Sequence, residues 1–114
     1  MKNVLVTGGC GFIGSNFVKY LISLKCYLPI ILDTLTYAGS KENINQINEE
    51  SFELVKGDIC DEQLLLNLFK KYKFDGIFHF AAESHVDRSI DAPREFIDTN
   101  IIGTFNLLQA SRAN

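Results

Sequence analysis

Four short apolar runs recur along the chain, at residues 4–6, 30–32, 52–55 and 77–80. The runs are continuous rather than alternating, which is typical of strands in a parallel sheet that is covered on both faces. Segments with helical spacing of apolar residues separate them. This alternation predicts an α/β fold built from repeated strand and helix units.

The first intervening helix is expected to open near Gly11 and to end around Lys25, with Pro29 introducing the second strand. Its predicted buried stripe consists of Ile13, Phe17, Leu21 and Leu24. The segment 41–48 has a weaker helical pattern.

A further amphipathic helix is expected after Asp61, a residue type that favours the N-cap position. Its apolar positions are Leu64, Leu65, Leu68, Phe69 and Tyr72. Residues 74–76, Phe-Asp-Gly, predict a turn into the fourth strand. A last helix is expected to begin near Pro93, which suits the first helical turn. Its inward residues are predicted as Phe96 or Ile97, Ile101, Thr104, Phe105 and Leu108.

Right-handed crossovers between these units predict a doubly wound, Rossmann-type parallel sheet of about four strands with the order 3-2-1-4. The strand order reverses between the first and fourth strands. Ligands of open α/β sheets bind at such a switch point, beyond the carboxyl ends of the strands. We therefore expect the functional site at this edge.

Composition limits the kind of protein that this chain forms. With 114 residues, 46% of them hydrophobic and 22% charged, one soluble globular domain is expected. The net charge of −3 and scattered basic residues argue against a nucleic-acid partner. No apolar run is long enough for a membrane helix, and the start resembles no signal peptide, so a cytoplasmic protein is expected.

The cysteines indicate neither a metal site nor a disulfide. Cys10, Cys26 and Cys60 form no CxxC pair, and they share no zinc-ligand spacing with His79 or His85. We expect reduced thiols and no metal. His79 lies within an apolar strand and is expected to be a hydrogen-bonded core residue rather than a base.

A glycine-rich motif follows the first strand directly. Residues 7–16 read TGGCGFIGSN, so Gly9, Gly11 and Gly14 match GxGxxG, while Gly8, Gly11 and Gly14 match GxxGxxG. Glycines here permit a tight turn and let the backbone approach a pyrophosphate, while the free N–H groups of the helix start attract the anion. Strand, loop and helix in this order predict a dinucleotide site.

Asp33 stands at the end of the second predicted strand, 19 residues after Gly14. A carboxylate at this place accepts hydrogen bonds from the adenosine ribose hydroxyls and repels a 2′-phosphate. No arginine follows closely. The sequence therefore predicts NAD rather than NADP as the cofactor.

Five motifs together resemble the extended short-chain dehydrogenases/reductases that act on nucleotide sugars. They are TGGCGFIGSN from Thr7, DTLTYAG from Asp33, GDICD from Gly57, AAESHVDRSI from Ala81 and TNIIGT from Thr99. They cover the whole chain in the order and spacing of the family, and AAESHVDRSI is the most specific of them.

The resemblance implies a role for each motif. Phe12 and Ile13 would lie against the pyrophosphate, residues 33–36 would hold the adenosine ribose, and Asp58 with Ile59 would flank adenine. Residues 80–84 would meet the nicotinamide and the sugar, with Ser84 also contacting the nucleotide-sugar substrate. The implied cofactor contacts are Gly8, Gly11, Phe12, Ile13, Gly14, Asp33, Thr34, Leu35, Thr36, Asp58, Ile59, Phe80, Ala81, Ala82, Glu83, Ser84 and Thr99. Simpler interpretations stay open: Asp58 closes a turn, Ile59 belongs to the core, and Ser84 caps local backbone.

Catalytic residues are not identified in this chain. The family uses a Tyr-x-x-x-Lys pair on a later helix, where lysine lowers the tyrosine pKa. Tyr37 and Lys41 have the spacing but follow the second strand on the adenosine side, so no catalytic role is expected for them. The chain is interpreted as an incomplete NAD-binding domain over residues 1–114, inactive alone, with later strands and the substrate domain absent.

Two consequences and two alternatives follow. The whole enzyme would be a homodimer, and this chain would self-associate through the exposed edge of the fourth strand. A related NAD-dependent nucleotide-sugar epimerase, decarboxylase or dehydratase fits the same residues. A non-catalytic NAD-binding interaction module is the alternative from another class.

Overall fold

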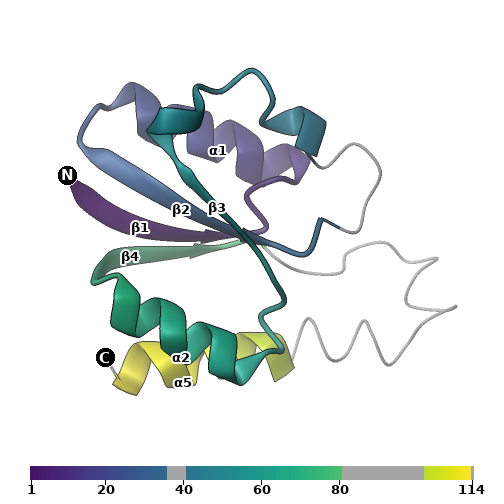
Figure 1. Cartoon of the computed structure of the whole chain (residues 1–114), viewed down its shortest axis with the longest axis vertical. Coiled ribbons are helices and arrows are strands. Elements are labelled where there is room, and N and C mark those ends of the chain that lie inside the picture. Colours follow the sequence, from purple (N-terminus) through teal and green to yellow (C-terminus); the bar gives the residue numbers. More distant parts are fainter. Residues whose placement is uncertain (36–40, 81–101, 114) are drawn as a thin grey trace, which may run out of the picture.

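The computed structural model describes residues 1–35, 41–80 and 102–113, which form one parallel sheet with helices on both faces (Figure 1). The strands are β1 (Lys2–Thr7), β2 (Tyr27–Asp33), β3 (Glu53–Lys56) and β4 (Phe74–His79). Every pair is parallel and the order is β3-β2-β1-β4. The predicted Rossmann-type order 3-2-1-4 is confirmed.

Two apolar clusters fill the two faces of the sheet. Helix α1 (Phe12–Ser23) covers one face, and α2 (Glu62–Lys71) with α5 (Thr104–Ala113) covers the other (Figure 1). Val4 and Val6 of β1 pack in the cluster that contains α1 residues, whereas Leu5 packs with residues of α2 and α5. This alternation explains why the strands are continuously apolar: successive side chains enter opposite cores.

The buried face of α1 differs from the predicted stripe. Its buried residues are Gly14, Ser15, Val18 and Leu21, whereas Ile13 is 69% and Leu24 44% exposed. Phe17 is half-buried. The inward prediction for Ile13 and Leu24 is wrong, because the close contact of Gly14 with the loop before the helix sets which side faces the sheet.

The same effect appears in α5. Leu107 and Ala110 are buried, whereas Phe105 and Leu108, predicted to face inward, are 58% and 64% exposed. Gly103 lies against Ile59 so closely that a Cβ there would be 2.4 Å from the Ile59 side chain. This contact places residues 103, 107 and 110 inward. Pro93, Phe96, Ile97 and Ile101 lie outside the described residues.

Helix α2 confirms its prediction. Asp61 is the N-cap, and its Oδ1 accepts a hydrogen bond from the N–H of Leu64 at 3.1 Å. Leu65, Leu68 and Phe69 are buried, while Leu64 and Tyr72 pack against the same core. The weaker segment 41–48 forms only a short 3-10 helix, η1 (Lys41–Asn43), and a second, η2 (Glu49–Ser51), precedes β3.

Two strand boundaries differ from the prediction. Pro29 lies inside β2 opposite Val4 rather than before the strand, and it costs no bond to β3 because that pairing begins at Ile30. Residues 74–76 begin β4 instead of forming a turn. The register shifts there, since Asn3 pairs with Phe74 and Val4 with Gly76, and the carboxylate of Asp75 accepts the N–H of Asn3 at 3.2 Å.

Smaller findings complete the fold. No disulfide joins Cys10, Cys26 and Cys60, all of which lie in the part of the chain that the structure describes. Within the part of the chain that the structure describes, no helix has the length and apolar character needed to cross a membrane.

Candidate dinucleotide site

A glycine-rich turn connects β1 to α1 at the carboxyl edge of the sheet. Gly8 has a φ of 70°, in the left-handed region that favours glycine. Its N–H donates to the carbonyl of Leu32 in β2 at 2.8 Å, and its carbonyl accepts the N–H of Gly11 at 3.1 Å. The turn is therefore tied to β2 and closed on itself.

The inner wall of this turn has no room for side chains. A Cβ at Gly14 would lie 2.2 Å from the carbonyl oxygen of Gly8, and a Cβ at Gly9 would lie 2.7 Å from Ile31. Gly14 is thus the residue that lets α1 start against the turn. The result is a cradle lined by backbone, which is what a pyrophosphate needs for close approach.

The start of α1 faces this cradle without a side-chain cap. Gly11 is the N-cap and makes no side-chain hydrogen bond to the first turn. Phe12 and Ile13, predicted to lie against the pyrophosphate, are 77% and 69% exposed. An uncapped helix start carries unsatisfied N–H groups and a partial positive charge, and both attract an anion.

Asp33 at the end of β2 is bonded to the glycine-rich turn. Its Oδ2 accepts the N–H of Cys10 at 3.0 Å, and its Oδ1 accepts the N–H of Leu35 at 2.9 Å. Leu35 has a φ of 58°, a conformation that this bond helps to hold. Each carboxylate oxygen keeps a further lone pair, so the group can still accept a ribose hydroxyl.

The turn after β3 carries Asp58 and Ile59. Asp58 is exposed and its Oδ1 accepts the N–H of Cys60 at 2.9 Å, which closes the turn. Ile59 is 3% exposed and belongs to the core. Any contact of Ile59 with adenine would therefore come from its backbone. Asn106 of α5, which the sequence analysis missed, donates to the carbonyls of Ile59 and Cys60 at 3.3 and 3.2 Å.

His79 at the end of β4 links three elements. Its Nδ1 shares a hydrogen bond with the hydroxyl of Thr7 in β1 at 2.6 Å, and its Nε2 shares one with the hydroxyl of Thr104 in α5 at 2.9 Å. The predicted hydrogen bonding of His79 is confirmed, but the residue is half-buried rather than part of the core, and neither hydroxyl partner was foreseen. Phe80, the next residue, donates its N–H to the carbonyl of Thr7 at 2.8 Å.

Burial lowers the pKa of His79 below its usual value of 6.5. The unfolded chain therefore binds a proton at this residue at a higher pH than the folded chain does. The contribution of the neutral His79 imidazole to the free energy of unfolding is complete above about pH 6.5 and is lost as the pH falls below that value. Urea unfolding at pH 7.5 and 5.5 is expected to show this loss, and the loss is expected to be smaller in His79→Gln. An identical pH dependence in both proteins would contradict the assignment.

Six of the predicted site residues lie outside the described part of the chain: Thr36, Ala81, Ala82, Glu83, Ser84 and Thr99. The predicted site residues that the structure describes, Thr34 among them, lie at or just after the carboxyl ends of β1 to β4, or at the start of α1. The structure thus brings the described predicted residues to one edge of the sheet (Figure 1).

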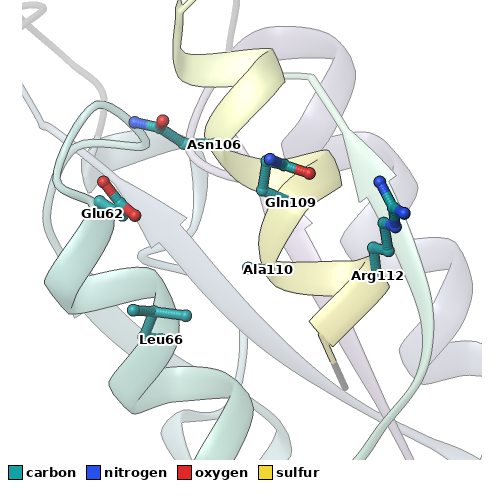
Figure 2. Close-up of a pocket in the computed structure, with 6 residues that line it drawn as sticks. All are labelled: Glu62, Leu66, Asn106, Gln109, Ala110 and Arg112. Atoms are coloured by element: carbon teal, nitrogen blue, oxygen red, sulfur yellow. The ribbon is translucent and has the colours of Figure 1, made fainter.

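A separate hollow of about 430 Å³ lies between α2 and α5, lined by Glu62, Leu66, Asn106, Gln109, Ala110 and Arg112 (Figure 2). It is on the face of the sheet opposite α1, and none of the predicted site residues that the structure describes lines it. It therefore forms no part of the glycine-loop site.

The order of the sheet and the backbone cradle before α1 define a Rossmann-type α/β protein. The family described as GDP-mannose 4,6 dehydratase matches residues 5–114. The chain belongs to this family. The resemblance to nucleotide-sugar enzymes that the motifs indicated is confirmed.

Two curated relatives share one enzyme name. The chain is 49% identical over 116 residues to dTDP-glucose 4,6-dehydratase of Neisseria meningitidis serogroup B, covering 99% of this chain and 32% of the relative. It is 48% identical over 110 residues to an Escherichia coli protein of the same name, covering 96% of this chain and 30% of that protein. The chain spans about a third of the length of the curated relatives it matches.

Solved structures of two enzymes are similar. A dTDP-glucose 4,6-dehydratase of Streptomyces venezuelae, with NAD and TYD bound, has a TM-score of 0.85 at 44% identity, over 96% of this chain and 35% of that one. A UDP-glucose 4-epimerase of Thermotoga maritima, with UDP-glucose, has a TM-score of 0.85 at 38% identity, over 96% and 33%. The fold is thus shared equally with both.

Proposed function

We propose that this chain binds NAD, and that it is the dinucleotide-binding part of a dTDP-glucose 4,6-dehydratase. The observation that carries the proposal is the cradle in which a Cβ at Gly14 would meet the Gly8 carbonyl at 2.2 Å, next to a carboxylate bonded to the same turn. This geometry fits a pyrophosphate and an adenosine ribose. Relatives of this name at 48–49% identity support the particular enzyme.

Asp33 supports NAD over NADP. Its carboxylate is held in place by the N–H groups of Cys10 and Leu35, so it cannot easily turn away from a ligand at the end of β2. A fixed negative charge there accepts ribose hydroxyls and repels a 2′-phosphate. The structure of a relative with NAD bound agrees with this choice.

The proposed contacts follow the chain along the sheet edge. The start of α1, with Phe12 and Ile13, binds the pyrophosphate, and residues 33–36 bind the adenosine ribose. Asp58 and the backbone of Ile59 border the adenine. Residues 80–84 and Thr99 are proposed to contact the nicotinamide side, with Ser84 also contacting the sugar. In this proposal residues 1–114 are one NAD-binding domain.

The reaction is proposed for the whole enzyme. When bound, NAD⁺ would supply a hydride acceptor for C4 of the glucose and, as NADH, a hydride donor for C6 once water has left across C5 and C6, with a proton returning to C5. The residues of this chain hold the dinucleotide and orient it, while a later Tyr-x-x-x-Lys pair moves the hydroxyl proton. Alone, the 114-residue chain is expected to give no product.

A UDP-glucose 4-epimerase is the second candidate, because an enzyme of that name shares the fold at the same TM-score. The lower identity, 38% against 44%, favours the dehydratase. The test is an assay of the protein at the full length of its curated relatives, with dTDP-glucose and with UDP-glucose. A 4-keto-6-deoxy product from dTDP-glucose is expected; UDP-galactose from UDP-glucose instead would contradict the dehydratase assignment.

We further propose that the whole enzyme is a homodimer that works in the cytoplasm. The absence of a disulfide among Cys10, Cys26 and Cys60 fits a reducing compartment.

The 114-residue chain is expected to self-associate. Within the described residues β4 pairs with β1 alone, so its other edge presents unpaired N–H and carbonyl groups. Phe78 on this strand is 39% exposed, and its ring is tilted by 51° against that of Phe17 at a centroid distance of 4.5 Å. Sedimentation at micromolar concentration is expected to show dimers or larger species, and fewer of them for Phe78→Lys. A compact wild-type monomer that unfolds cooperatively would contradict this expectation.

A further inference from the structure

Cys10 carries the side chain at the centre of the glycine-rich turn, between Gly9 and Gly11. It is fully buried and packs in the same cluster as Val18 of α1 and Ile44. The turn is thus anchored by one side chain, while its glycines leave the backbone free to rotate. Hydrogen bonds to the backbone must therefore determine how its peptide groups are oriented.

Both peptide groups of Cys10 are held. The N–H of Cys10 donates to Asp33 Oδ2 at 3.0 Å, which fixes the peptide before it. The carbonyl of Cys10 accepts a hydrogen bond from Asn43 Nδ2 at 2.7 Å, and the N–H of Gly11 in the same peptide donates to the Gly8 carbonyl at 3.1 Å. The Cys10–Gly11 peptide is therefore bonded at both its oxygen and its nitrogen.

Asn43 reaches this carbonyl from a separate segment, 33 residues further along the chain. It ends η1, and the next residue, Ile44, is 5% exposed in the cluster that contains Cys10. The carbonyl of Ile44 accepts the N–H of Ile47 at 3.0 Å, which closes the turn that follows. Burial of Ile44 thus places the Asn43 amide, and a carbonyl acceptor requires the NH₂ end of that amide.

The orientation of the Cys10–Gly11 peptide matters for an anion. It immediately precedes Phe12, the first residue of α1, where the uncapped N–H groups begin. Rotation of this peptide would turn the carbonyl oxygen of Cys10 away from Asn43 and would break the hydrogen bond from Gly11 to Gly8. A carbonyl oxygen that faced the start of α1 would repel phosphate. A donor that binds the oxygen opposes this rotation.

We propose that Asn43 is a positioning residue for the pyrophosphate site: its amide holds the Cys10–Gly11 peptide in the orientation that leaves the cradle open to an anion. This inference rests on the proposed binding of NAD. Asn43 does not itself contact the dinucleotide in this account. It acts on the turn through the carbonyl of Cys10, just as Asp33 holds the turn through the N–H of Cys10.

The test compares four forms of the 114-residue chain: wild type, Asn43→Leu, Asn43→Gln and Asn45→Leu. Leucine removes the donor at similar size, and glutamine keeps a donor one methylene further out. Asn45→Leu is the matched control, because Asn45 is exposed two residues away. The measurements are the Kd for NAD⁺ by calorimetry, the melting temperature, and the amide exchange rate of Gly11 by NMR without ligand.

Asn43→Leu is expected to bind NAD⁺ about tenfold more weakly, because one well-formed hydrogen bond to the turn is lost. The Gly11 amide is expected to exchange faster in this variant. Asn45→Leu is expected to match the wild type, and Asn43→Gln to recover most of the affinity. Wild-type affinity and exchange in Asn43→Leu would overturn the inference.

Two other outcomes also decide whether the inference about Asn43 holds. If Asn43→Leu does not fold, a folded Asn43→Gln with near wild-type affinity supports the role of the donor, and one that has lost the affinity overturns it. If the folded wild type does not bind NAD⁺, the proposed function fails by itself. The amide exchange rate of Gly11 then tests the role of Asn43. Faster exchange in Asn43→Leu supports the proposal that Asn43 holds the turn, and unchanged exchange overturns it.

Discussion

Gly14→Ala is expected to weaken NAD⁺ binding by at least about 100-fold and to destabilise the folded chain by about 3 kcal/mol. The new Cβ would lie 2.2 Å from the carbonyl oxygen of Gly8 and 3.0 Å from the Cα of Gly9. All of these neighbours are backbone atoms, so no side chain can rotate to make room. The start of α1 must then move away from the turn, and the cradle loses its shape.

Gly76→Ala is the matched control, because among the described residues a Cβ at that glycine meets nothing closer than the Phe78 ring at 3.9 Å. Calorimetric titration gives the two affinities, and urea unfolding gives the two stabilities. Wild-type NAD⁺ affinity in Gly14→Ala would show that the cradle is not the binding site.

Asp33→Asn is expected to weaken NAD⁺ binding by roughly 30-fold, because a charged hydrogen-bond partner is lost. An amide has only one oxygen acceptor, so it cannot serve Cys10 N–H and Leu35 N–H on two separate oxygens as the carboxylate does. The bond to the turn and the acceptor for ribose therefore weaken together. The preference for NAD⁺ over NADP⁺ is also expected to narrow, because the charge that repels a 2′-phosphate is gone.

Asp75→Asn supplies the same chemical change at the opposite edge of the sheet, where Asp75 accepts the N–H of Asn3. It is expected to leave both affinities unchanged. Equal loss of NAD⁺ affinity in the two variants, or an unchanged preference in Asp33→Asn, would contradict the role given to Asp33.

The strand order could be predicted because it depends on local signals. Continuous apolar runs correctly indicated strands covered on both faces, and the glycines after β1 lie beside Asp33 at the end of β2, as the sequence indicated. Chain connectivity and handedness then leave few arrangements. The N-cap role of Asp61 was equally local.

The helix faces could not be predicted from apolar spacing alone. In α1 and α5 the side that meets the sheet is set by a glycine in tight contact, Gly14 on Gly8 and Gly103 on Ile59. Spacing arguments count large side chains, so they selected Ile13 and Leu108, which are exposed. Where the backbone of a helix packs this closely against its neighbour, the smallest residue rather than the most hydrophobic one faces the core.

The hydrogen bonds that support the site could not be predicted from the sequence either. Thr7, His79 and Thr104 meet across three elements, and Asn43 reaches Cys10 over 33 residues. Threonine and asparagine are common on surfaces and in turns, so their types carry no signal of a long-range partner. Such contacts become visible only when the sheet order has placed their elements side by side.

The most direct measurement is calorimetric titration of the 114-residue chain with NAD⁺ and, separately, with NADP⁺. Binding of NAD⁺ with clearly weaker or absent binding of NADP⁺ is the result that the cradle and Asp33 predict. A folded chain that binds neither, or that binds NADP⁺ as tightly as NAD⁺, would contradict the central claim.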